Sequence, residues 1–197
     1  VSIDAGASWT QITTFATPTV PAGATVGGGT VFAFDLSSAV SGGRTQGIYA
    51  SVYGTGVYVT SNAGGSWALT SGTPTTHRRI VVGSTGTVWM ADNSNGSFNY
   101  NRRLSGTWSQ MAPAGGGGSS GWSPAVDPAD ATHVVFVNSD GSSNQSTDGG
   151  TNWTRVTTIN RVATDIPWLA TTNESFFSNG DAKFDPSVSN KLYVGEG

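Results

Sequence analysis

Two carboxylates in the segment Thr158–Gly180 are the residues best suited to chemistry. Asp165 and Glu174 lie nine residues apart, and the same segment carries the aromatic residues Trp168 and Phe176. Two carboxyl groups can hydrolyse a glycosidic bond as general acid and general base, at about 6.5–9.5 Å in an inverting site or about 5 Å in a retaining one. Their spacing in sequence does not decide between these two separations, and Asp165 and Glu174 are predicted as the catalytic pair.

Aromatic and acidic side chains of this segment and of other parts of the chain could hold a sugar. Flat aromatic faces stack against pyranose rings, and carboxylates accept hydrogen bonds from paired hydroxyls. Trp168, Trp122, Tyr53 and Phe176 are therefore predicted to bind substrate, with Asp92 as a binding carboxylate. The alternative for Trp168 and Phe176 is that they fill the core between sheets.

An eight-residue pattern occurs three times, as Ser2–Trp9, Thr60–Trp67 and Ser146–Trp153. It consists of a hydroxyl residue, any residue, Asp or Asn, any residue, Gly, two mostly small residues and Trp. Such a pattern closes a tight β-hairpin, since Asp or Asn accepts bonds from turn amides and Gly supplies a positive φ. We predict structural roles for the acidic or amide residue and the tryptophan of each copy: Asp4, Trp9, Asn62, Trp67, Asp148 and Trp153.

The spacing of the marker tryptophans predicts the fold. Trp67, Trp108 and Trp153 are 41 and 45 residues apart, which is the length of a four-stranded propeller blade. The expected fold class is an all-β propeller with four-stranded antiparallel blades, as one partial domain over residues 1–197. Its expected parts are a partial blade (1–15), three blades (29–72, 78–112 and 121–158) and a second partial blade (180–197).

The order of strands expected in each blade assigns the loops to the two ends of the propeller. We label the strands of each blade A to D from the channel outward, with strand A of the first full blade over Thr30–Asp35 and an insertion at Ser37–Gly43. The repeated hairpins join C to D and share one end with the A–B turns, where Asp35, Asp127 and Asp185 are expected to form turns. The B–C and D–A loops share the opposite end, which is the expected functional end.

The three hairpins resemble the Asp-box, or BNR, repeats of sialidases, sortilin-type receptors and xyloglucanase-type glycoside hydrolases of family seventy-four. The string Ile48–Val59 before Asn62, and Ala125–Pro128, are most similar to blades of the xyloglucanase group. The resemblance implies a propeller of about seven blades, of which this chain is a part, and an acid–base pair of aspartates that cleaves β-glucans. At the strand end matching the family's base aspartate, this chain has Tyr53. A sialidase would need an arginine triad and a Phe-Arg-Ile-Pro-like motif, which the sequence lacks.

Composition narrows the classes of partner. The net charge is −3 with scattered basic residues, which argues against a nucleic-acid partner, and the chain has no apolar run of the roughly 20 residues needed for membrane insertion. Cysteine is absent and the two histidines, His77 and His133, are isolated, so we expect no metal site and no cofactor.

Two functions stay open at this point. One is a secreted, extracellular glycoside hydrolase that acts on or binds a β-linked polysaccharide of the xyloglucan or β-glucan type, with inversion if it is catalytic. The other is a non-catalytic Asp-box propeller that serves as a glycan-binding, adhesive or surface-assembly module. In both cases the expected partners are a polysaccharide or glycan and further blades, from the rest of the chain or from another chain.

Overall fold

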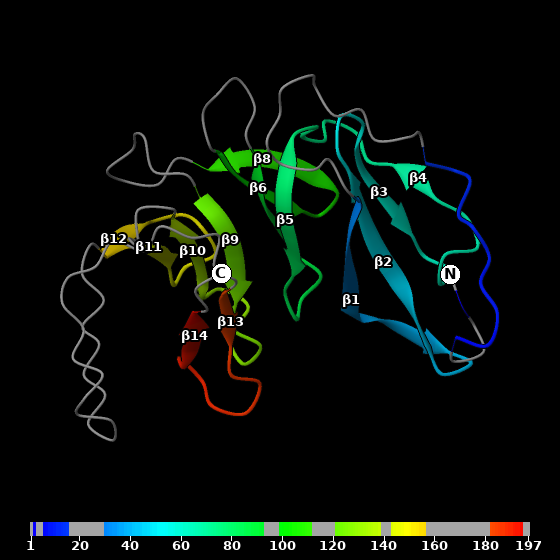
Figure 1. Ribbon diagram of the computed structural model, residues 1–197. Coiled ribbons are helices and arrows are strands. Elements are labelled where there is room, and N and C mark those ends of the chain that lie inside the picture. Colours follow the sequence, from blue (N-terminus) through cyan, green and yellow to red (C-terminus); the bar gives the residue numbers. More distant parts are fainter. Residues whose placement is uncertain are drawn as a thin grey trace, which may run out of the picture.

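A computed structural model describes residues 2, 6–15, 30–92, 99–111, 121–138, 143–156 and 182–194. The regular structure in these ranges is entirely β-sheet (Figure 1). For Trp122 the backbone alone is described. Five residues with predicted roles lie outside the described residues: Asp4, Asp165, Trp168, Glu174 and Phe176.

The first sheet contains β1 (Thr30–Ser41), β2 (Arg44–Val52), β3 (Gly56–Thr60) and β4 (Ala68–Leu69), in that order and all antiparallel. Short apolar and β-branched runs separated by glycine-containing turns favour such strands. The sequence predicts that the innermost strand ends at Asp35, and this is wrong.

Strand β1 continues through the expected insertion to Ser41, beyond an irregularity in register between Asp35 and Val40. The Asp35 carboxylate accepts a bond from the Ser37 amide at 3.0 Å, and the Ser38 hydroxyl accepts one from the Gly47 amide at 2.8 Å. These bonds bend the strand and still keep it paired with β2, as a bulge does.

The second sheet has the same order of strands: β5 (His77–Val82), β6 (Val88–Asp92), β7 (Asn99–Leu104) and β8 (Thr107–Met111). Strands β7 and β8 are joined by a two-residue turn in which Ser105 and Gly106 both have positive φ. Such a turn closes a hairpin tightly. It replaces the turn of the eight-residue pattern that the first and third sheets have at this position.

The third sheet consists of β9 (Gly121–Val126), β10 (Val134–Asn138), β11 (Ser143–Ser146) and β12 (Thr154–Val156). A two-stranded sheet, β13 (Ala182–Phe184) and β14 (Leu192–Val194), follows. The innermost strands contact one another in the order β1, β5, β9, β13. Figure 1 shows the four sheets along an arc, with the turns after these strands at one end, at the bottom of the view. The predicted all-β architecture of four-stranded antiparallel blades is confirmed.

The core lies between the sheets rather than within one of them. Between the second and third sheets, Trp89 is fully buried and meets Phe136 and Trp153 edge-on, at centroid distances of 6.3 and 6.2 Å. Tyr100 stacks on Phe136 at 4.0 Å and accepts a hydrogen bond from Asn144 at 2.9 Å. Aromatic contacts of this kind add to the free energy gained by burying the rings.

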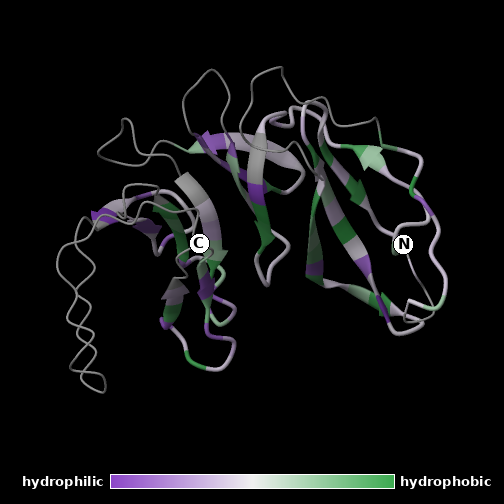
Figure 2. Cartoon of the chain, viewed as in Figure 1, coloured by the Kyte–Doolittle hydropathy of each residue, from purple (hydrophilic) through white to green (hydrophobic). Residues whose placement is uncertain are grey.

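The other two interfaces have similar apolar clusters. Tyr49 and Val57 of the first sheet pack with Met90 of the second, and Val135 of the third sheet packs with Phe184 of β13. Figure 2 shows the apolar residues along the strands that contribute to these clusters. Each sheet is therefore stabilised mainly by its neighbours along the arc.

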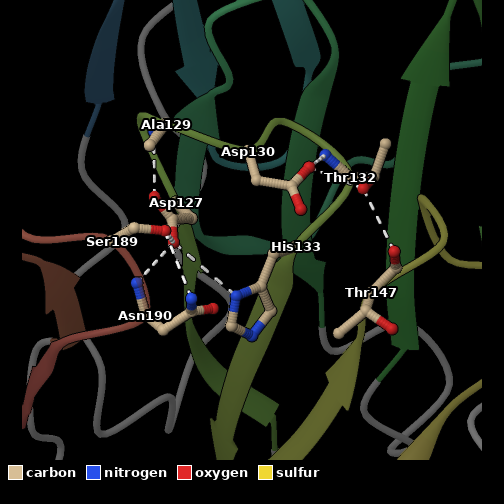
Figure 3. A network of polar contacts seen from close by, with 8 residues as sticks. All are labelled: Asp127, Ala129, Asp130, Thr132, His133, Thr147, Ser189 and Asn190. Carbon is tan, nitrogen blue, oxygen red and sulfur yellow. Dashed lines mark hydrogen bonds and ion pairs between the residues drawn. The ribbon is translucent and has the colours of Figure 1, made fainter.

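A buried carboxylate ties the third sheet to β13 and β14. Asp127, which is fully buried, accepts bonds from the Ala129 amide at 2.9 Å and, across the interface, from the Asn190 amide at 2.8 Å (Figure 3). The His133 ring lies beside it, with Nδ1 3.7 Å from the carboxylate. Burial alone would raise the pKa of Asp127, but the amides of Asn190 and Ala129 outweigh it and lower the pKa.

We expect Trp153→Ala to lower the free energy of unfolding by about 3–5 kcal/mol, because it opens a cavity beside Trp89. Urea unfolding followed by circular dichroism measures this change. Trp9→Ala is the matched control, since Trp9 is 76% exposed and its removal should change the free energy by less than about 0.5 kcal/mol. Equal effects of the two substitutions would contradict the packing described above.

Candidate functional site

The turn between β2 and β3 begins at Tyr53, which is half-buried. Its neighbour Gly54 donates a backbone hydrogen bond to the carbonyl of Thr75 at 2.8 Å. Thr75 belongs to the connection that leads into β5, so this bond fixes the B–C turn of the first sheet against the second sheet.

Thr73 holds the same connection in place. Its hydroxyl accepts a hydrogen bond from the Val57 amide at 2.8 Å. A Cβ on Gly56, whose φ is +133°, would lie 2.3 Å from the Thr73 methyl, so only glycine allows this approach. The backbone around Tyr53 is thereby set by tight local packing.

Asp92 ends β6 at the same end of the sheets. Its side chain is 3% exposed and accepts hydrogen bonds from Asn101 Nδ2 at 2.6 Å and from Thr76 Oγ1 at 3.4 Å. A buried carboxylate needs such donors, because it is strongly disfavoured without them. Its substrate-binding role stays a prediction; in this structure Asp92 is part of a hydrogen-bonded network.

The structure brings two of the predicted site residues to one place. Thr75 contacts the Tyr53 turn and the adjacent Thr76 contacts Asp92, so Tyr53 and Asp92 flank the connection between the first two sheets. Trp122 is the second residue of β9, the innermost strand of the third sheet. The catalytic assignment of Asp165 and Glu174, and the binding roles of Trp168 and Phe176, remain predictions.

Sequence reasoning missed Asn101 and Thr76 as partners of Asp92. The signal for Asn101 is the run Asn99-Tyr100-Asn101-Arg102-Arg103, where an amide falls on a buried position of a strand. Polar side chains buried in a strand are hydrogen-bonded to a partner, and the nearest acidic residue along the chain is Asp92. Thr76 carries no comparable signal.

The repeated turns lie at the opposite end of the sheets. The Ser146 hydroxyl accepts a bond from the Gly150 amide at 2.8 Å, Thr60 accepts the equivalent bond from Gly64 at 3.1 Å, and Ser2 accepts one from Gly6 at 2.8 Å. The three glycines have φ of 90–92°. One local geometry thus recurs in all three copies.

The residue before the turn glycine binds the backbone near the A–B turn. The Ala63 amide donates to the Gln46 carbonyl at 3.0 Å, and the Gly149 amide donates to the Thr132 carbonyl at 2.9 Å. The repeated turns and the A–B turns therefore share one end, and the Tyr53 turn lies at the other. Arg102 of the second sheet also donates to the Gly149 carbonyl, which joins neighbouring blades.

The tryptophans of the repeat differ in burial. Trp153 is 8% exposed and fills the space between the second and third sheets, and Trp67 is half-buried against Phe15 and Phe32. Trp9 is 76% exposed and fills no gap between the described sheets, and its structural role stays a prediction.

Within the described ranges, no group of three or more His, Asp or Glu side chains could hold a metal ion. The same part of the chain contains no helix of the length and apolarity that a membrane span requires.

Sheets of four antiparallel strands, packed face to face with their innermost strands adjacent, define a β-propeller. The chain is similar to several known proteins. A xyloglucanase from a Paenibacillus species is 26% identical over 243 residues, which cover all of this chain and 24% of the relative. No family model matches the chain.

Two solved structures share the fold. The GH74 enzyme of Niastella koreensis is 25% identical with a TM-score of 0.61 and covers 84% of this chain and 28% of its own. The GH74 xyloglucanase of Xanthomonas campestris is 22% identical with a TM-score of 0.63, over 84% of this chain and 26% of its own. The chain is a β-propeller that resembles these xyloglucanase-type enzymes, as its motifs predict, and spans about a quarter of the length of these relatives.

We expect the free energy of unfolding to depend less on pH in Asp148→Asn than in the wild type below about pH 4. The amide and side chain of Asn152 and the Ser146 hydroxyl donate to Asp148, which lowers its pKa from 3.8 to about 2. The stabilisation from this carboxylate is therefore fully present above about pH 4 and is lost as the pH falls through 2. Urea unfolding between pH 4 and pH 2 should show a smaller loss for Asp148→Asn than for the wild type.

The reciprocal change is the matched test, because the first turn has Asn62 at the equivalent position. Asn62 accepts a bond from the Ser66 amide at 2.8 Å and one from Thr60 Oγ1 at 2.7 Å. Asn62→Asp should increase the loss of stability over the same pH range. Profiles that superimpose on the wild type for both variants would rule out this role for the turn carboxylate.

Proposed function

We propose that the chain forms part of the propeller of a secreted glycoside hydrolase that acts on xyloglucan or a related β-glucan. The observation that carries this proposal is the likeness to a xyloglucanase over the whole length of the chain, together with the fold it shares with two GH74 enzymes. An extracellular location fits a polymeric substrate of this kind.

In this proposal, Asp165 and Glu174 form the acid–base pair. One carboxyl group protonates the departing glycosidic oxygen, and the other carboxylate takes a proton from the attacking water, which inverts the anomeric centre. Both residues belong to the connection between the third sheet and β13, a D–A connection like the one that carries Thr75 and Thr76. The Tyr53 turn and Asp92 lie beside the D–A connection between the first two sheets.

A second candidate is a propeller that binds glycan without cleaving it. Tyr53 stands where the resemblance implies a base carboxylate, and Asp92 is almost fully buried and held by Asn101. Neither offers a free carboxylate to substrate in this structure. This observation favours binding over hydrolysis within the described residues.

We also infer that further blades cover the outer face of the first sheet. Phe32, Phe34, Leu36 and Leu69 are 46–80% exposed, although the equivalent surfaces between the described sheets are buried. An apolar face of this kind is unfavourable in water. The relatives, about four times as long, contain enough chain to provide such blades.

Release of reducing ends from xyloglucan and from a mixed-linkage β-glucan tests the hydrolase proposal. We expect release by the wild type and a loss of at least about a hundredfold in Asp165→Asn and in Glu174→Gln, the scale of general acid–base catalysis. Asp148→Asn is the matched control, since it makes the same change at the opposite end and should leave the rate unchanged.

Affinity electrophoresis in the same polysaccharides separates the two candidates. Retarded migration without any release of reducing ends would support the binding module and reject the hydrolase. Release that persists in Asp165→Asn and Glu174→Gln would assign catalysis to other residues.

A further inference from the structure

Three of the innermost strands lead to an aspartate that accepts an amide of its own turn. The acceptors are Asp35, Asp127 and Asp185, and the donors are the amides two residues further on, at 3.0, 2.9 and 2.8 Å. In each turn the bond is made to Oδ1 of the carboxylate. The second oxygen, Oδ2, is therefore left to accept bonds from other groups.

Asp127 uses this second oxygen to bind the next sheet. Its Oδ2 accepts the Asn190 amide at 2.8 Å and the Ser189 hydroxyl at 3.3 Å, both from the turn between β13 and β14 (Figure 3). Asn190 has a φ of +62°. The A–B turn of one sheet thus donates to the aspartate of the sheet before it.

Asp35 meets the second sheet in a similar way. Gly86, in the turn between β5 and β6, has a φ of +79°, and a Cβ placed on it would lie 3.5 Å from Asp35 Oδ2. At both interfaces, a residue with positive φ that follows a hydroxyl residue (Thr85 or Ser189) lies against the aspartate of the preceding sheet. The second sheet has Gly83 at the position of the aspartate.

Asp185 repeats this turn in the last sheet of the arc. The partners that the structure shows for its Oδ2 are the Tyr193 hydroxyl at 3.0 Å and the Lys191 ammonium at 3.7 Å, both from its own sheet. The Ser187 amide is the main cause of the lowered pKa of this carboxyl, so it is ionised at neutral pH. An ionised carboxylate has room for a further amide donor.

The sheet of β13 and β14 has one face that no described sheet covers. Phe184 packs on Val135 of the third sheet. Tyr193 and its cross-strand partner Lys183 lie on the opposite face, because successive side chains of a strand alternate between the two faces. Tyr193 is 53% exposed on this open face.

The equivalent residue of every other sheet is buried by the next sheet. Tyr193 pairs with the residue two positions before Asp185, and the same register position is held by Tyr49, Trp89 and Val135. These three side chains are at most 5% exposed, and each packs against the following sheet. The exposure of Tyr193 therefore marks a surface of the kind that a following sheet covers.

We propose that a further blade packs on this face, covers Tyr193 and donates a backbone amide of its A–B turn to Asp185. By analogy with Thr85-Gly86 and Ser189-Asn190, that turn carries a hydroxyl residue followed by Gly or Asn with positive φ. The proposal rests on the further blades inferred above, and adds the face that they bind and the groups that hold them. Relatives about four times as long favour a blade of the same protein over a second copy.

Hydroxyl-radical footprinting of the protein expressed from its complete gene, compared with residues 1–197 alone, tests the proposal. We expect the labelling of Tyr193 to fall about tenfold in the complete protein, the ratio of its exposed fraction of 53% to the 5% of Tyr49. Leu104, 49% exposed beside the two-residue turn, is the reference and should be labelled equally in both. Leu36 reports on the outer face of the first sheet.

Two variants test the role of the carboxylate. Asp185→Ala should raise the labelling of Tyr193 severalfold in the complete protein, because the amide of the further blade loses its acceptor. Each variant is compared with the same variant of residues 1–197, which cancels the loss of the bond within the sheet. Asp130→Ala is the matched control, since this turn carboxylate accepts bonds from Thr132 of its own turn, and should leave Tyr193 protected.

Equal labelling of Tyr193 in the complete protein and in residues 1–197 would overturn the proposal. If Leu36 is protected in that case, further blades bind elsewhere, and if Leu36 is labelled too, the inference of further blades fails with it. Protection of Tyr193 in residues 1–197 that increases with concentration would identify a second copy as the occupant and also overturn the proposal. Equal effects of Asp185→Ala and Asp130→Ala would reject the role of Asp185.

Discussion

Packing between neighbouring sheets is the interaction on which the rest of the structure depends. Each sheet has two to four short strands, and its apolar side chains are buried by the next sheet along the arc. Trp89, Phe136 and Trp153 show this most clearly, because they come from two sheets and form one buried cluster. The stability of a blade is therefore a property of its interfaces, as in other repeat architectures.

The two ends of the sheets differ in how they join neighbouring sheets. At one end, the repeated turns bond to the backbone near the A–B turns, and Asp127 joins the third sheet to β13 and β14 through Asn190. The polar groups there are used in holding sheets together. At the other end, the connection that contains Thr75 and Thr76 joins the first sheet to the second and is hydrogen-bonded to the Tyr53 turn. It is at this end that we place the proposed chemistry.

The repeat made the fold predictable from sequence. A local motif with a hydroxyl, an acidic or amide residue, a glycine and a tryptophan has one stable geometry, and its spacing sets the length of a blade. The extension of β1 beyond Asp35 was not predictable in this way, since it depends on Ser38 meeting Gly47 from the neighbouring strand. The exposure of Trp9 likewise depends on which sheet lies next to it, which the motif does not encode.

The predicted site stays a prediction, and the structure describes the surroundings of two of its residues, Tyr53 and Asp92. Topology assigned Tyr53 and Asp92 to one end, and both flank the connection through Thr75 and Thr76. The burial of Asp92 by Asn101 was missed, because the partner lies on the adjacent strand and its role follows from register.

The central claim is that glycan meets the end of the sheets that carries the B–C and D–A connections. Hydrogen–deuterium exchange with and without a xyloglucan oligosaccharide tests it most directly. We predict slower exchange in residues 53–56 and 73–76 and unchanged exchange in the repeated turns at 60–67 and 146–153. Protection confined to the repeated turns would contradict the account.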